Sequence, residues 1–365
     1  MHWARLLFPF PLKIYIMSPN NTNPQAYDIR YDVIRTVAII FVITIHSLQL
    51  LYEASMAEGN VLSPTTLSYS LLQFVHTGVP IFIMLSGALL LAKEEPMGAF
   101  FKKRCVRLLK PFLLWSVIVF ALRYVMELGG DSLWGYLKGL AYATVYDNGA
   151  HTIYWYVFLI VTLYLFTPAL RVYVHAASKG NIYFLLALML AVEILDFCLP
   201  DTTLLAYFPV KFMIKLKFFI GGYAIVRYMQ HESWYKPAVI TSLVIGYAVL
   251  IVNLWCNDSE FAKDTYRLCS LLAIGIFGLL YVSIPCNVSE QRHPIIRVVK
   301  AISRYSYGIY LTHFLFISFF LRLFPGIVSA LPICVEPLVM AFCVLVADAV
   351  MIHLLCKLGI RNWVC

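Results

Sequence analysis

The stretch Tyr31-Asp-Val-Ile-Arg-Thr-Val-Ala-Ile-Ile-Phe-Val-Ile-Thr-Ile-His-Ser47 has the length and composition of a first membrane-spanning helix, yet it contains three ionisable residues, Asp32, Arg35 and His46. Arg35 and His46 are 11 positions apart, so at about 100° per residue they lie within roughly 20° of the same helix face. The helical rise separates them by about 16 Å, with Arg35 at the membrane edge and His46 beyond the middle of the hydrocarbon core. Because ionisable side chains in lipid are costly, we expect this polar face to line a cavity.

The composition predicts a multispanning membrane protein. Hydrophobic residues make up 61% of the chain and charged residues 13%, whereas soluble domains contain about 25% charged residues. Apolar runs of about 17 to 25 residues predict membrane-spanning helices. Ten such runs predict an all-α bundle of about ten transmembrane helices, at residues 33–52, 69–92, 111–127, 153–173, 181–198, 209–228, 237–255, 267–284, 306–324 and 332–356.

The positive charges predict the orientation. An even number of spans places both termini on one side of the membrane, and most of the 28 Lys and Arg residues fall in the segments that this arrangement assigns to the cytoplasm. Cytoplasmic loops are enriched in these residues, so both termini are predicted to be cytoplasmic. Because the net charge of +9 largely reflects this bias, the sequence favours no nucleic-acid partner.

The domain organisation follows from the same pattern. Residues 1–30 are predicted to be a disordered cytosolic leader, within which Met17 is an alternative translation start, and residues 31–365 a single transmembrane domain. The nine cysteines lack metal-type spacing, so no metal site is predicted. Cys198 and Cys256, near the outer ends of two spans, are interpreted as small buried hydrophobes, with disulfide pairing as the alternative.

Further motifs follow the first helix in a fixed order. They are Ser86-Gly87 at the end of an apolar segment, Arg104-Cys-Val-Arg107 in a basic loop, Tyr154-Trp-Tyr running to Thr167-Pro168, Lys217-Phe-Phe-Ile-Gly-Gly-Tyr223, and Ser306-Tyr-Gly-Ile-Tyr-Leu-Thr-His313. Together with the Asp32, Arg35 and His46 pattern, they resemble the acyltransferase-3 family of integral membrane O-acyltransferases over residues 28 to about 325. One departure is Ile153, where members that modify surface glycans often have a histidine; here His151 stands two residues earlier.

The resemblance implies an acyl-CoA-dependent enzyme of the cell inner (plasma) membrane. The expected donor is acetyl-CoA, used as a substrate without a tightly bound cofactor, and the expected acceptor is a hydroxyl of a cell-surface polysaccharide or its lipid-linked precursor. His46 is the expected general base, because an imidazole titrates near neutral pH and can exchange a proton with the reacting groups. Asp32 and Arg35 are assigned to the same catalytic group, with a structural ion pair between them as a compatible alternative.

Basic residues near the cytosol are the candidates for donor binding. Arg35, Lys103, Arg104 and Arg107 are assigned to the anionic end of coenzyme A, because Arg104 and Arg107 share one helix face and can clamp a phosphate. The alternative is topological charge that contacts anionic lipid headgroups, which is favoured for the lysines of this loop.

Residues near the outer surface are the candidates for acceptor binding, namely Tyr154, Trp155, Tyr156, His151 and Lys215. The alternatives are an aromatic belt at the membrane interface and a lysine that extends to that interface. Glu193 or Asp348 is expected to orient His46, as a carboxylate orients a catalytic imidazole, whereas His313 is interpreted as a packing residue. A polar track with an intramembrane histidine is also typical of proton-coupled transporters of small molecules, which is the alternative function.

Overall fold

The computed structural model describes residues 27–57, 66–123, 154–198, 208–256, 269–286, 294–324 and 335–365, together with Trp134 and Lys138. Most of the predicted leader and the predicted acceptor residue His151 lie outside these residues. The side chains of Cys198 and Cys256 are also outside the described part, so their pairing stays a prediction.

The described residues are almost entirely helical and contain no β-strand, which confirms the predicted all-α membrane fold. Each predicted apolar stretch overlaps one or two of the described helices, and 6 of the described helical stretches are long and apolar enough to cross a membrane. The count of ten crossings and the side of the termini stay predictions. The elements are α1 (Ile29–Ala57), α2 (Thr66–Val75), α3 (Gly78–Leu91), α4 (Met97–Arg123), α6 (Trp155–Ala176), α7 (Lys179–Cys198), α8 (Phe208–Arg227), η3 (Met229–His231), α9 (Tyr235–Cys256), α11 (Cys269–Ser283), α12 (Ile295–Leu323), α13 (Glu336–Lys357) and α14 (Arg361–Val364).

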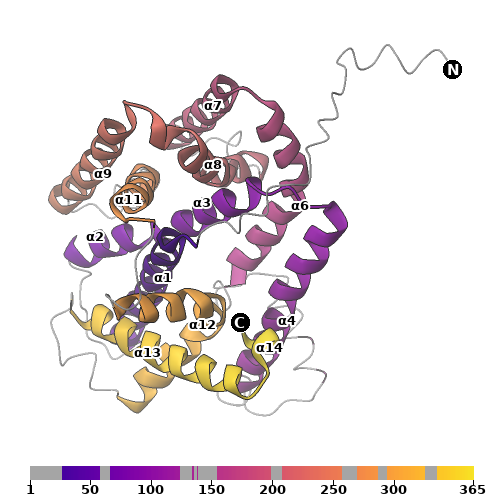
Figure 1. The fold of residues 1–365 in the computed structure, drawn as a ribbon. Coiled ribbons are helices and arrows are strands. Elements are labelled where there is room, and N and C mark those ends of the chain that lie inside the picture. The colour runs from indigo at the N-terminus through magenta and orange to yellow at the C-terminus, as the bar shows by residue number, and fades with distance from the viewer. Residues whose placement is uncertain are drawn as a thin grey trace.

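The helices are arranged around α1 and α3. Figure 1 shows these two helices in the middle of the bundle, with α7, α8, α9 and α11 on one side and α12 and α13 on the other. Helices α4 and α6 close a third side, and the short α14 folds back from α13 onto α4. The hydrophobic core therefore forms where α1 and α3 meet the surrounding helices.

The apolar stretch 69–92, predicted as one span, consists of two helices that separate at His76 and Thr77. Pro80 explains the break, because a proline in a continuous helix would clash with the carbonyl four residues earlier, here that of His76. In the first turn of α3 the missing amide hydrogen of Pro80 has little cost, since the first amides of a helix have no intrahelical partner. The Thr77 hydroxyl donates to the Phe74 carbonyl at 2.7 Å across the corner.

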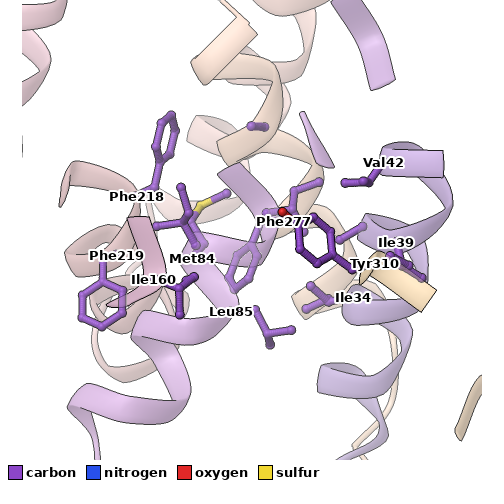
Figure 2. Packing of buried hydrophobic residues seen from close by; sticks show 14 of the residues in the cluster. Ile34, Ile39, Val42, Met84, Leu85, Ile160, Phe218, Phe219, Phe277 and Tyr310 are labelled. Carbon is purple, nitrogen blue, oxygen red and sulfur yellow. The ribbon is translucent and has the colours of Figure 1, made fainter. Parts of the chain in front are cut away.

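Helices α3 and α8 cross at two glycines. A Cβ atom on Gly87 would lie 1.7 Å from the Phe219 carbonyl oxygen, and one on Gly222 would lie 1.9 Å from the Met84 carbonyl oxygen. No side chain tolerates such distances, so the two helices pack backbone against backbone, as small residues permit in membrane proteins. Met84 and Phe219 flank the crossing within the apolar core (Figure 2).

The substitution Gly222→Ala should destabilise the bundle, because its Cβ atom would force α3 and α8 apart. Overpacking of a core typically costs about 1–3 kcal/mol, and a clash with backbone should reach the upper part of that range. The matched control is Gly98→Ala in α4, where nothing lies within 4 Å of an added Cβ atom. Thermal unfolding in detergent should show a lower midpoint for Gly222→Ala alone, and equal midpoints would contradict the packing argument.

Candidate active site

A cavity of about 300 Å³ runs between α1, α3, α4, α6 and α12. One wall of the cavity follows a stripe of α3 from Val79 to Leu90 and continues to Lys93 just after the helix, a length of about 21 Å at the helical rise. The end near Lys93 is cationic, whereas the opposite end is lined by Val42, Val79, Phe82 and other apolar or aromatic residues. The cavity is thus long and narrow, with its charge concentrated at one end.

Arg35 lies at the cationic end and is held by α12. Its Nη1 atom donates to the Ser303 hydroxyl at 3.0 Å and lies 3.6 Å from the Asp32 carboxylate. Ser303 donates in turn to Asp32, which also accepts a hydrogen bond from the Tyr27 hydroxyl. Asp32 therefore positions Arg35 and connects α1 to α12. Sequence reasoning missed Ser303, which has no charge to attract notice.

Five basic side chains line the cationic end. They are Arg35, Lys93, Arg104, Arg107 and Arg304. Three of them belong to the predicted donor site, whereas Lys93, at the start of the basic loop, and Arg304, on α12, were not predicted as donor residues. Partial burial and the charges of Arg104 and Lys103 lower the pKa of Lys93. Lys103 itself is exposed and does not line the cavity, so its contact with a donor stays a prediction.

The C-terminal end of α3 is capped by α6. The last carbonyls of a helix lack intrahelical partners and carry partial negative charge. Arg171 Nε donates to the Leu90 carbonyl at 2.8 Å, and His175 Nε2 donates to the Leu91 carbonyl at 2.8 Å. Arg171 is buried although it is charged, and these bonds explain why it is tolerated there. The cap fixes α3 beside the cavity.

Glu95 connects this cap to the cavity. Its carboxylate lies 3.1 Å from Arg171 and 3.3 Å from Arg104. Burial raises the pKa of Glu95, but the hydrogen bonds and charges of Arg171 and Arg104 outweigh that effect and lower the pKa below its ordinary value. Glu95 therefore stays ionised and holds Arg104 in place at the wall of the cavity.

The substitution Glu95→Gln should lower stability at neutral pH, because it removes the carboxylate that both arginines share. A carboxylate with a lowered pKa stabilises the folded state above its unfolded pKa, and this contribution is lost as the pH falls through its folded pKa. The difference in thermal midpoint between the parent and the variant should therefore close on acidification. Glu94→Gln is the control, since the Glu94 side chain is 84% exposed and lies 3.6 Å from His175 rather than between the two arginines. A difference that persists at acidic pH would contradict this account.

Two histidines lie against each other beyond the inner end of the cavity. The ring centroids of His46 and His313 are 5.1 Å apart. The Nδ1 atom of His46 lies 3.0 Å from the Gln49 side-chain oxygen, and Nδ1 of His313 donates to the backbone carbonyls of Tyr310, at 2.7 Å, and Ile309, at 3.2 Å. In both rings these bonds place the hydrogen of the neutral imidazole on Nδ1 and leave the lone pair on Nε2.

The two histidines extend the stripes that line the cavity. On α1, Arg35 and Val42 line it and His46 follows one turn later on the same face. On α12, Tyr310 lines it and His313 follows one turn later. Val42 and Tyr310 both belong to the apolar cluster in Figure 2. Neither imidazole lines the cavity, yet both lie within a helical turn of its inner end.

Neither of the two expected carboxylates accepts a hydrogen bond from His46 in the described part of the chain. Glu193 forms a buried ion pair with Lys217 that joins α7 to α8. Asp348 accepts a hydrogen bond from the Thr312 hydroxyl, which joins α13 to α12. The partner of the imidazole is therefore an amide on its own helix. Sequence spacing does not reveal which buried acids are already paired.

The predicted acceptor residues of α6 have different environments. Tyr156 lines the inner end of the cavity, where its ring is 5.6 Å from that of Tyr310. Tyr154 is buried against Phe112, with ring centroids 5.4 Å apart. Trp155 is exposed at the surface of the protein. Tyr156 is therefore the residue of this group that the structure brings to the cavity.

Lys215 lies on α8, away from the lining of the cavity. It belongs to the neighbourhood of Glu193 and Lys217, on the side of the bundle formed by α7 and α8. Its contact with an acceptor, like that of His151, stays a prediction.

One comparison with known proteins identifies the family. The acyltransferase-3 family model, described as an acyltransferase domain, matches residues 28–352. The chain belongs to the acyltransferase-3 family. It is a multi-pass membrane protein of an acyltransferase family, and the match extends beyond the motifs into α13. No curated protein and no solved structure matches it.

The motifs of this acyltransferase-3 protein have distinct structural roles. Ser86 lines the cavity while the adjacent Gly87 permits the crossing with α8. Ser306 also lines the cavity, and a Cβ atom on Gly308 would lie 2.5 Å from the Val364 carbonyl oxygen. Each Ser and Gly pair thus combines one residue that faces the cavity with one that permits close backbone packing.

Proposed function

We propose that the protein transfers an acyl group, in the simplest case acetyl, from acyl-CoA to a hydroxyl of a cell-surface polysaccharide or its lipid-linked precursor at the plasma membrane. The observation that carries the proposal is the cavity, which is cationic at one end and leads toward His46 at the other. Such a cavity suits a donor with an anionic head, a slender arm and a reactive thioester at its tip.

The donor assignment rests on charge and shape. Guanidinium groups bind phosphates through charge-assisted and often bidentate hydrogen bonds. Arg35, Arg104, Arg107 and Arg304 meet at the cationic end, which would hold the phosphates of coenzyme A. The arm would then follow the α3 stripe between apolar side chains, and the thioester would reach the inner end near Tyr156.

The chemistry rests on the state of His46. With its Nδ1 hydrogen directed to Gln49, the lone pair on Nε2 can take the proton of an attacking hydroxyl. The oxygen then bonds to the thioester carbonyl carbon, and the Tyr156 hydroxyl is a candidate donor for the negative charge that develops on the carbonyl oxygen. Gln49 is exposed and His46 only half-buried, so the acceptor would approach from the side of Gln49, opposite to the donor.

The substitution His46→Gln should abolish acyl transfer without loss of folding, because the amide retains hydrogen bonding but cannot carry a proton. We expect the rate to fall by about 10²–10⁴-fold. The measurement is transfer of labelled acetyl groups from acetyl-CoA to surface glycan, with mass spectrometry of the product. The control is His353→Gln, which changes an exposed histidine on α13. Near-normal transfer by His46→Gln would remove the general-base assignment.

The substitution Arg107→Ala should raise the KM for acyl-CoA much more than the KM for the acceptor. Loss of one hydrogen bond to a charged group costs about 1.5–3 kcal/mol, which corresponds to roughly a 10- to 100-fold increase. Lys102→Ala removes the same charge from an exposed position outside the cavity lining and should leave both constants unchanged. If the two variants behave alike, the basic loop serves the membrane surface rather than the donor.

A further inference from the structure

His313 has an unexplained polar atom. Its side chain is fully buried, and within the described residues its Nε2 atom has no hydrogen-bond partner. Leaving a buried acceptor unpaired destabilises the folded state, and native proteins retain few such groups without a reason. The Nδ1 hydrogen is already given to the Tyr310 carbonyl, so the ring presents a free lone pair in a buried site.

The position of this lone pair connects it to the proposed reaction. His313 follows the cavity-lining Tyr310 by one turn, with ring centroids 6.0 Å apart, and its ring contacts that of His46. The two imidazoles differ in exposure: His46 is half-buried and bonded to the exposed Gln49, whereas His313 has no exposed surface. His46 is thus placed toward the acceptor side and His313 toward the donor side.

Resting on the proposed function, we propose that His313 is a second catalytic imidazole, which delivers to the departing thiolate the proton that His46 removes from the acceptor. The acceptor oxygen bonds to the carbonyl carbon while its proton moves to Nε2 of His46. The proton then passes to Nε2 of His313, directly or through one water molecule. As the tetrahedral intermediate collapses, the carbon–sulfur bond breaks and the proton moves to sulfur, which leaves both imidazoles neutral.

Two imidazoles can carry the proton from the acceptor side of the site to the donor side without turning. A single imidazole would have to take a proton from the acceptor side and release it toward the donor side. The Nδ1 bonds of both rings restrain such a rotation. When the two rings are in contact, each ring keeps its orientation and only the proton moves between them. The arrangement therefore predicts that the need for His313 depends on the leaving group, whereas the need for His46 does not.

The experiment compares two donors, acetyl-CoA and its selenoester analogue. A selenol is a stronger acid than a thiol, and leaving groups of lower pKa depart more readily, so the selenolate needs no proton. The test variant is His313→Asn, whose amide can still donate to the Tyr310 carbonyl but has no equivalent of Nε2. The matched control is His353→Asn, at an exposed histidine whose Nδ1 lies 2.9 Å from the Tyr305 hydroxyl.

With acetyl-CoA, His313→Asn should lose about 10²–10⁴-fold in transfer rate, and the selenoester should restore most of the loss. His46→Gln should be impaired with both donors, and His353→Asn with neither. His313→Gln provides the same comparison if His313→Asn folds poorly. A His313 variant that is fully active with acetyl-CoA, or equally impaired with both donors, overturns the proposal while the parent activity stands. A parent protein that transfers acyl groups from neither donor overturns the proposed function itself.

Discussion

Ionisable side chains of the first helix cannot face lipid without a large cost in free energy, and this constraint pairs α1 with α12. Near the start of α1, Arg35 and Asp32 are satisfied by each other and by Ser303. Deeper in the bundle, His46 meets His313. Helices α1 and α12 therefore share a polar contact near Arg35 and another near His46. Residues between these two contacts line one wall of the cavity. The position of the candidate site follows from that pairing.

The opposite wall depends on packing rather than on charge. Helix α3 is held on one side by backbone contact with α8 at Gly87 and Gly222, and its end is held by Arg171 of α6. Both contacts involve backbone carbonyl oxygens, whose positions a helix cannot adjust independently. These contacts hold α3 opposite the pair of α1 and α12 across the cavity, and positioned walls are what bring reacting groups together.

Charge is distributed unevenly along the cavity. Basic residues cluster where α1, α4 and α12 approach the predicted cytosolic side, and Glu95 neutralises part of that charge through Arg104 and Arg171. The inner end is aromatic and apolar up to the two imidazoles. The charged head of an anionic ligand would therefore stay at the cationic end, and its uncharged tip would reach the inner end. Electrostatic interactions are strongest in such an apolar environment.

The sequence by itself determined the helical membrane fold, the polar face of α1, three of the basic residues at the cationic end of the cavity, and the family. Each of these depends on the length of apolar runs, on helical periodicity or on local motifs. Only the tertiary structure decided which polar groups are partners. It divided the second span at His76 and Thr77, paired Glu193 with Lys217 rather than with His46, brought Lys93 and Arg304 to the cavity, and placed His313 against His46. These contacts join residues from different helices. Periodicity defines the faces of one helix, but the meeting of two faces depends on how whole helices pack.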